Sequence, residues 1–107
     1  SEMCIRDSCT IEGHVENSVL SNSVTVGAGA RVLYSILHPG VVVEPGAVVE
    51  YAILGEGTVV GAGAHVGAQP DGTDAWCVAT VGPDVAVPAG ATVPAGAMIY
   101  DGAEVHA

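Results

Sequence analysis

"VPAGATVPAGAM", residues 87–98, states one hexapeptide twice: Val87-Pro-Ala-Gly-Ala-Thr is followed by Val93-Pro-Ala-Gly-Ala-Met. An α-helix cannot use this spacing, because six residues at about 100° each turn the seventh side chain away from the face of the first. A single long strand would not accept Pro88 and Pro94 in its interior. The repeat therefore predicts a larger regular structure assembled from short units.

The same spacing runs through the end of the chain. Steps of six from residue 81 always reach a branched apolar residue: Val81, Val87, Val93, Ile99 and Val105. The fourth residue after each of the first four is small or branched: Val85, Ala91, Ala97 and Ala103. We expect each hexad to be one short strand and one corner, with both of these residues pointing inward and Gly or Pro at the bend.

The first part of the chain follows the same rule with a period of seventeen, in rows that begin at residues 9, 26, 43 and 60. The aligned columns are Cys9, Val26, Val43 and Val60; Gly13, Ala30, Ala47 and Ala64; Val15, Val32, Val49 and Val66; and Val19, Ile36 and Ile53, with Leu20, Leu37 and Leu54 beside them. Seventeen is three hexads minus one residue, so each row is predicted to be one coil with three short sides.

Short hexads of this kind are typical of a parallel β-helix. We predict an all-β fold, a single-stranded triangular prism over residues 9–107, and expect it to be left-handed because hexapeptide-repeat proteins are, although most parallel crossovers are right-handed. The predicted core is Val26, Val32, Ile36, Val43, Val49, Ile53, Val60, Val66, Val81, Val87, Val93 and Ile99.

Two segments depart from the repeat. The register breaks at "GAQPDGTDAWCVAT", which contains a Gln-Pro-Asp-Gly turn signal, so residues 67–80 are expected to form a loop outside the coil. The first eight residues, "SEMCIRDS", match no repeat and resemble adapter-derived translations at the head of metagenomic reading frames. We expect residues 1–8 to be such a scar and exclude them from the predicted fold.

Composition excludes several classes of function. The formal charge is −10 and the chain has no lysine, which argues against binding nucleic acid or an anionic membrane surface. No apolar run approaches the roughly 20 residues that cross a bilayer. The three cysteines, Cys4, Cys9 and Cys77, are irregularly spaced. We therefore expect no disulfide framework and a cytoplasmic location.

The polar residues predict no catalytic, cofactor-binding or metal site. His14 and His65 share a column three coils apart, about 14 Å, which is too far for one metal ion. A hexapeptide acyltransferase is the enzyme alternative, with His38 or His65 as general base, but outside residues 1–8 only Arg31 is available for coenzyme phosphates. Six carboxylates are expected to stay solvated: Glu44, Glu50, Glu56, Asp71, Asp74 and Asp84.

Residues 11–67 carry "VENSVL" and the rows "YSIL" and "YAIL", and residues 87–99 read "VPAGATVPAGAMI". In these rows the chain resembles the C-terminal β-helix of bacterial glucose-1-phosphate adenylyltransferase, also called ADP-glucose pyrophosphorylase. The tails of other sugar-nucleotide transferases are close competitors.

The resemblance implies a parent enzyme of glycogen synthesis that makes ADP-glucose and pyrophosphate from ATP and glucose 1-phosphate with magnesium. The coil of such an enzyme contacts the catalytic domain, helps to build a homo- or hetero-tetramer and couples effector binding to the active site. The resemblance leaves catalytic and regulatory subunit types open, and it implies that this chain is a fragment without cofactor and inactive alone.

Family members that respond to sugar phosphates tend to carry arginines on the stretch that reads "ENSVLSNSVTV" here, where this chain has Glu16, Asn17 and Asn22. The resemblance therefore predicts that the parent either responds weakly to phosphorylated effectors through this surface or is a regulatory-type subunit.

Overall fold

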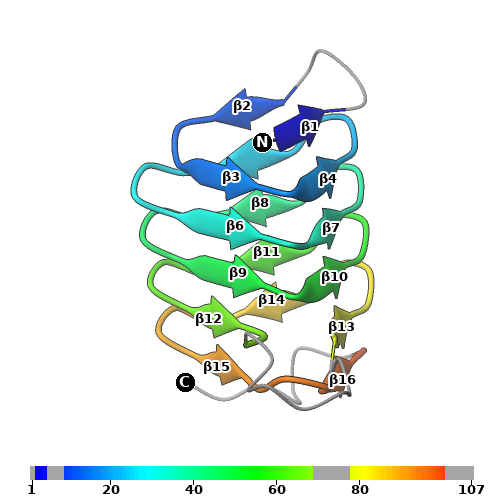
Figure 1. The fold of residues 1–107 in the computed structure, drawn as a ribbon. Helices are drawn as coiled ribbons and strands as arrows, with labels where there is room; N and C mark the ends of the chain where they lie inside the picture. The colour runs from blue at the N-terminus through cyan, green and yellow to red at the C-terminus, as the bar shows by residue number, and fades with distance from the viewer. Residues whose placement is uncertain (1, 5–8, 69–77, 101–107) are drawn as a thin grey trace.

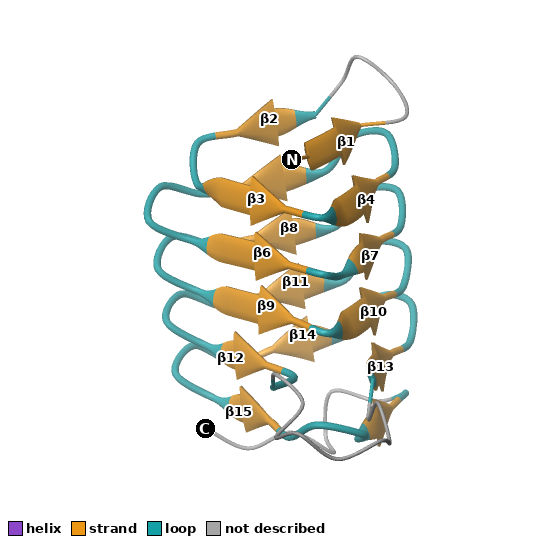
Figure 2. Ribbon diagram, viewed as in Figure 1, coloured by secondary structure: helices purple, strands orange, loops and turns teal. Residues whose placement is uncertain are grey.

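The computed structural model describes residues 2–4, 9–68 and 78–100, which fold into a three-sided prism of stacked coils (Figure 1). All strand pairs are parallel, and each coil contributes one strand to each of three sheets, here named A, B and C. Within the described residues the structure contains strands and turns and no helix (Figure 2), and so no helix that could span a membrane. The prediction of an all-β parallel β-helix is confirmed.

The strands are only two or three residues long, as a hexad of one strand and one corner requires. Sheet A contains β1 (Glu2–Cys4), β4 (Ser18–Leu20), β7 (Ile36–Leu37), β10 (Ala52–Leu54), β13 (Ala79–Val81) and β16 (Met98–Ile99). Sheet B contains β2 (Thr10–Ile11), β5 (Thr25–Val26), β8 (Val42–Val43), β11 (Val59–Val60) and β14 (Ala86–Val87). Sheet C contains β3 (His14–Glu16), β6 (Arg31–Leu33), β9 (Val48–Glu50), β12 (His65–Val66) and β15 (Thr92–Val93).

The coil is left-handed. Followed down the prism in Figure 1, the chain crosses the front from left to right through β6 and β7 and returns behind from right to left through β8. This sense of rotation is the reverse of the usual parallel crossover, and it is the hand expected from hexapeptide-repeat proteins.

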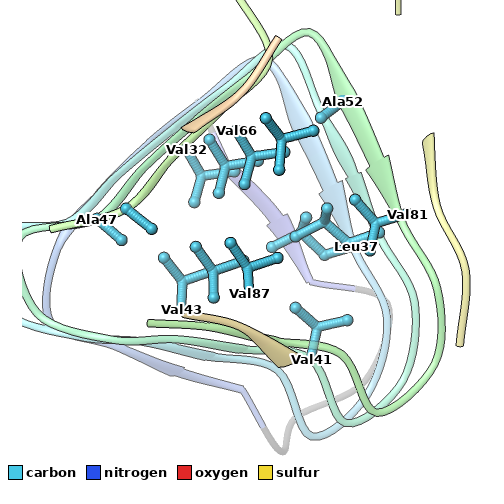
Figure 3. Close-up of a cluster of buried hydrophobic side chains, with 14 of the residues drawn as sticks. Val32, Leu37, Val41, Val43, Ala47, Ala52, Val66, Val81 and Val87 are labelled. Carbon is cyan, nitrogen blue, oxygen red and sulfur yellow. The ribbon is translucent and has the colours of Figure 1, made fainter. Parts of the chain in front are cut away.

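The interior is filled by columns of identical or similar side chains. Val32 and Val66 lie on one side of the prism, Val43 and Val87 on the second, and Leu37 and Val81 on the third (Figure 3). The ladder pairs place these residues directly over one another, and the inward valines of sheets B and C are at most 4% exposed: Val26, Val43, Val60 and Val87, and Val15, Val32, Val49, Val66 and Val93. From the second coil on, the inward position at the corner between sheets B and C is a buried alanine: Ala30, Ala47, Ala64 and Ala91.

Sheet A corrects the predicted core at two positions. Ile36 and Ile53 point outward, Ile36 being 42% exposed and Ile53 half-buried, and the large inward residues of these two strands are the fully buried Leu37 and Leu54. The reason is the residue that each seventeen-residue coil lacks. It is missing from the corner between sheets C and A, so the small inward residue, Ser35, comes three residues after Val32 rather than four, and the next inward residue, Leu37, comes five residues after Val32 rather than six.

In the first coil, the predicted column that begins with Cys9 and continues at Val26 is wrong. Ile11, and not Cys9, pairs with Val26, because the corner between β2 and β3 is two residues shorter than in the next coil. Gly13 occupies this tight corner, where a Cβ atom would lie 2.5 Å from the carbonyl oxygen of Ala30 and 2.6 Å from that of Gly27. No residue with a side chain fits at that distance.

The structure describes only part of the two segments that depart from the repeat, residues 1–8 and 67–80. Glu2–Cys4 form β1, which pairs in parallel with β4, so part of residues 1–8 adds a strand to sheet A, and their origin stays a prediction. Gly67 is still in register with the next coil, and β13 begins at Ala79, inside the predicted 67–80 loop. Residues 69–77 lie outside the described part of the chain.

One expectation about the cysteines is wrong: Cys9 is disulfide-bonded. Its half-buried sulfur lies 3.1 Å from the carbonyl oxygen of Ser21. Pairing depends on how closely the fold brings two Cα atoms together, which irregular sequence spacing does not exclude.

Replacing Val49 by Asp is expected to unfold the prism, because an unpaired carboxylate in the dry interior costs several kcal/mol against a total stability of about 5–15 kcal/mol. Val48→Asp is the matched control, since Val48 is the outward neighbour on β9 and is only half-buried. Circular dichroism with thermal unfolding checks both variants. A cooperatively folded Val49→Asp protein, as stable as Val48→Asp, contradicts the inward column.

The corrected register of sheet A predicts that Leu37→Ala lowers the free energy of unfolding by about 2–5 kcal/mol through loss of buried volume. Ile36→Ala, one residue earlier on the same strand, is expected to cost less than about 1 kcal/mol because Ile36 is exposed. Urea unfolding of the two variants measures the difference. Equal losses, or a larger loss at Ile36, would reverse the assignment.

Candidate functional site

The outer face of sheet C carries the charged side chains that the strands present to solvent. The Nε2 atom of His14 lies 2.9 Å from Oε2 of Glu16, and that of His65 lies 3.0 Å from Oε1 of Glu50. The hydrogen bond with His14 lowers the pKa of the Glu16 carboxyl, so Glu16 stays negative to lower pH than a free glutamate. Arg31 lies between the two pairs in the register.

The histidines do not converge. His14, Arg31, Val48 and His65 are successive register partners, which places the two histidines three coils apart, as the seventeen-residue period predicts. His38 is exposed at a corner between sheets A and B, and His106 lies outside the described residues. Among the side chains that the structure describes, no group of three His, Cys, Asp or Glu residues is placed to hold a metal ion.

Two of the carboxylates support the backbone or a neighbour. Oε1 of Glu44 accepts the N–H of Ala62 from the next coil at 3.2 Å, and Glu50, with 18% of its side chain exposed, is held against His65. Glu56 and Asp84 are exposed at corners between sheets A and B. Asp71 and Asp74 belong to the segment that the structure does not describe.

The corner between sheets C and A is the most unusual part of the backbone. In the first three coils a single residue with positive φ joins the strands: Asn17 (48°), Tyr34 (50°) and Tyr51 (51°). This left-handed conformation costs a residue with a side chain about 1–2 kcal/mol. The rings of Tyr34 and Tyr51 stack with centroids 5.0 Å apart and an interplanar angle of 13°, which is worth about 0.5–1.5 kcal/mol. Stacking therefore offsets part of the backbone strain.

Buried serines complete this corner. The Ser18 hydroxyl donates to the carbonyl of Glu16 and accepts the N–H of Ser35, at 2.8 and 3.0 Å. Ser35 repeats the pattern with the carbonyl of Leu33 and the N–H of Ala52, at 2.9 and 3.2 Å. Each hydroxyl thus bonds a backbone group where the tight corner interrupts the regular ladder. Ala52 needs no hydroxyl, because the N–H of Ala79 reaches the carbonyl of Tyr51 instead.

The outer face of sheet A, in contrast to sheet C, is apolar. Its outward column consists of successive register partners without a charge: Val19, Ile36, Ile53, Thr80 and Met98. The four exposed large hydrophobic residues of the described chain all belong to this side: Tyr34 (47%), Ile36 (42%), Met98 (61%) and Tyr100 (59%). We call these seven residues, together with Tyr51, the sheet A surface. Such a surface suits contact with another protein surface rather than chemistry on a substrate.

The sequence analysis missed this surface because it assigned Ile36 and Ile53 to the core. A signal was present: in three coils a small residue precedes the middle apolar residue and a leucine follows it, in Ser18-Val19-Leu20, Ser35-Ile36-Leu37 and Ala52-Ile53-Leu54. Alternation along a strand puts the small residue and the leucine on the inner face, which leaves the middle position outside.

Comparison with known proteins agrees with this architecture. Residues 1–87 match the family model described as "GlmU-like, C-terminal hexapeptide". Over 38 residues the chain is 53% identical to glucose-1-phosphate adenylyltransferase of Clostridioides difficile (strain 630), a match that covers 36% of this chain and 10% of that protein. The resemblance to glucose-1-phosphate adenylyltransferase that the sequence rows predicted is therefore matched by a known enzyme of that name, over a short stretch.

Among solved structures, the acetyltransferase domain of PglB from Neisseria gonorrhoeae FA1090 is similar in fold, with a TM-score of 0.50 and 22% identity, over 95% of this chain and 52% of that one. GDP-perosamine N-acetyl transferase from Caulobacter crescentus matches with a TM-score of 0.42 and 20% identity, over 94% of this chain and 50% of that one. The chain thus spans about a tenth of the curated relative and about half of each structure. The family match covers more than three quarters of the residues, and the chain belongs to the GlmU-like C-terminal hexapeptide family.

Proposed function

We propose that this chain is the C-terminal β-helix of a glucose-1-phosphate adenylyltransferase, with a structural and regulatory role and no catalysis of its own. The observation that carries the proposal is the 53% identity with the Clostridioides difficile enzyme over 38 residues. The rows "VENSVL", "YSIL" and "YAIL" support it, because a generic hexad needs none of these polar and aromatic residues. Formation of ADP-glucose from ATP and glucose 1-phosphate, with magnesium, would belong to the rest of the parent enzyme.

The sheet A surface supports a role in assembly. Its outward column is uncharged although the chain as a whole carries −10, so a partner can approach it with little charge repulsion, and exposed large apolar residues lie on this side: Tyr34, Ile36, Met98 and Tyr100. We assign the sheet A surface as the contact with the parent's catalytic domain or with another subunit of its tetramer. Sheet C, with its exposed ion pairs, would stay in solvent.

The polar residues at the start of the coil support a weak response to phosphorylated effectors. Glu16 is exposed, and its lowered pKa keeps it negative, which disfavours a phosphate nearby. Asn17 and Asn22 flank β4 at its two corners and carry no charge. Without arginine at these positions, the surface lacks the charge-assisted bonds that hold a phosphate.

The function is tested by expressing the complete parent enzyme and measuring ADP-glucose formation from ATP, glucose 1-phosphate and magnesium. We expect activity in the complete enzyme, none in the 107-residue chain, and an upstream reading frame that encodes a nucleotidyltransferase domain. An upstream frame without such a domain, together with coenzyme A binding by this chain, would favour a hexapeptide acyltransferase instead.

In the same complete enzyme, Ile36→Asp is expected to weaken assembly by placing a charge on the sheet A surface, with at least a severalfold loss of the assembled form. Val48→Asp places the same charge on the outer face of sheet C and is expected to leave assembly unchanged. Sedimentation velocity measures both. Equal assembly of the two variants contradicts the sheet A contact without bearing on the reaction catalysed.

A further inference from the structure

The corner between sheets C and A carries two tyrosines whose rings face each other across neighbouring coils. Asn17, Tyr34 and Tyr51 hold the same place in the corners β3–β4, β6–β7 and β9–β10, which belong to successive coils of the prism (Figure 1). The rings of Tyr34 and Tyr51 are nearly parallel, with centroids 5.0 Å apart. Rings lying edge to edge in one plane could not approach so closely, so their faces overlap, and the stack runs along the prism.

The preceding coil has Asn17 at this position, so the stack of rings does not continue beyond Tyr34. One face of the Tyr34 ring lies against Tyr51, and the opposite face is turned toward the coil of Asn17. That coil lies directly against Tyr34, whose N–H donates to the carbonyl of Glu16 at 3.0 Å. Tyr34 is 47% exposed whereas Tyr51 is 9% exposed. An aromatic face is therefore open to solvent at the edge of the sheet A surface.

Two carboxylates stand beside this open face, at the edge of sheet C. Glu16 and Glu50 both pair in the register with Leu33, the residue before Tyr34, so one lies in the preceding coil and the other in the following coil. The Glu16 side chain is 48% exposed and that of Glu50 only 18%. One oxygen of Glu16 is bonded to His14, but a carboxylate offers about four acceptor sites. Glu16 can therefore accept further donors.

An aromatic face beside a carboxylate selects a planar cation. The face of a tyrosine ring attracts a cation placed within about 6 Å of the ring centroid, and a carboxylate adds charge-assisted hydrogen bonds. The guanidinium group of arginine meets both requirements, because it is flat enough to stack on a ring and carries five N–H donors, whereas the ammonium group of lysine is compact. Phosphates and nucleotides have the wrong sign of charge for a chain that carries −10.

We propose that the open face of Tyr34, with Glu16 beside it, binds an arginine side chain of the polypeptide that covers the sheet A surface. This inference rests on the proposed function, which puts the catalytic domain or another subunit on that surface. Arg31 is the one arginine in the described part of the chain, and it begins β6 and pairs with His14, on sheet C rather than at this corner. The guanidinium therefore belongs to the partner, and stacking on the ring while bonding the carboxylate fixes the orientation of that partner.

The test uses the complete parent enzyme and measures its assembly by sedimentation velocity over a range of protein concentrations. Tyr34→Leu removes the aromatic face and is expected to weaken assembly by about 2- to 30-fold, whereas Tyr34→Phe keeps the face and should assemble like the wild type. Tyr51→Leu is the matched control, because it loses the same ring stack but keeps the open face of Tyr34. Glu16→Gln should weaken assembly severalfold and make it less sensitive to salt, because the charge of the carboxylate is lost.

Assembly of Tyr34→Leu equal to that of Tyr51→Leu overturns the proposal. A loss in Tyr34→Leu that Glu16→Gln does not share also overturns it, because that pattern indicates a neutral partner such as an aromatic side chain. A structure of the complete wild-type enzyme gives a second test that does not depend on how the variants fold. A guanidinium group is expected within about 6 Å of the Tyr34 ring centroid, and a partner without one at this face contradicts the proposal.

ADP-glucose formation and the Ile36→Asp variant separate this inference from the proposed function. An enzyme that makes ADP-glucose, and whose assembly is weakened by Ile36→Asp but not by Tyr34→Leu, leaves the proposed function standing and overturns the arginine contact. Assembly that depends on Tyr34 and Glu16 in a protein that forms no ADP-glucose supports the contact and contradicts the proposed function.

Discussion

The stacking of like side chains inside a narrow triangular prism is the constraint from which the rest of this structure follows. Parallel strands lie about 4.8 Å apart, so each inward residue rests on the same type of residue one coil away. Valine suits this position on sheets B and C because its branched side chain fills the gap without a polar atom, and every valine of the two columns is buried. A chain with no phenylalanine can thus form a dry core from small residues.

The corners decide how many residues each coil contains. Corners built as four-residue turns, such as Gly61–Ala64, give hexads, whereas the corner at Asn17, Tyr34 or Tyr51 turns the chain with one left-handed residue and shortens the coil to seventeen. Two tyrosines in that conformation are strained, and their stacked rings and the adjacent serine hydroxyls oppose the strain. The row "YSIL" therefore encodes a corner of the coil.

Sequence periodicity predicted the columns of sheets B and C, because from the second coil on the step from sheet B to sheet C is a full hexad, as from Val26 to Val32. It failed on sheet A for a physical reason: a residue is missing from the preceding corner, and two adjacent apolar residues, as in Ile36-Leu37, both satisfy a hydrophobic pattern. The pairing of Ile11 with Val26 was equally hidden, since the short corner at Gly13 changes the step only once. The sheet A surface was not predicted for the same reason, because Ile36 and Ile53 had been assigned to the core.

The three faces of the prism differ in chemistry, and this difference bears on function. Sheet C presents ion pairs, and sheet A presents an uncharged column with exposed tyrosines. The outward residues of sheet B are uncharged and smaller: Thr10, Thr25, Val42, Val59 and Ala86. A body with one face of exposed large apolar residues suits a domain that assembles in one orientation.

The stacking itself is tested most directly by NMR couplings transmitted through hydrogen bonds between backbone nitrogen and carbonyl carbon. The account predicts couplings between residues sixteen apart in the sequence, such as Val48 N with the Ala64 carbonyl and Arg31 N with the Ala47 carbonyl, which are bonded at 2.8 and 2.9 Å. Couplings at other separations for these amides, or slow exchange without any partner sixteen residues away, would contradict the stacked prism.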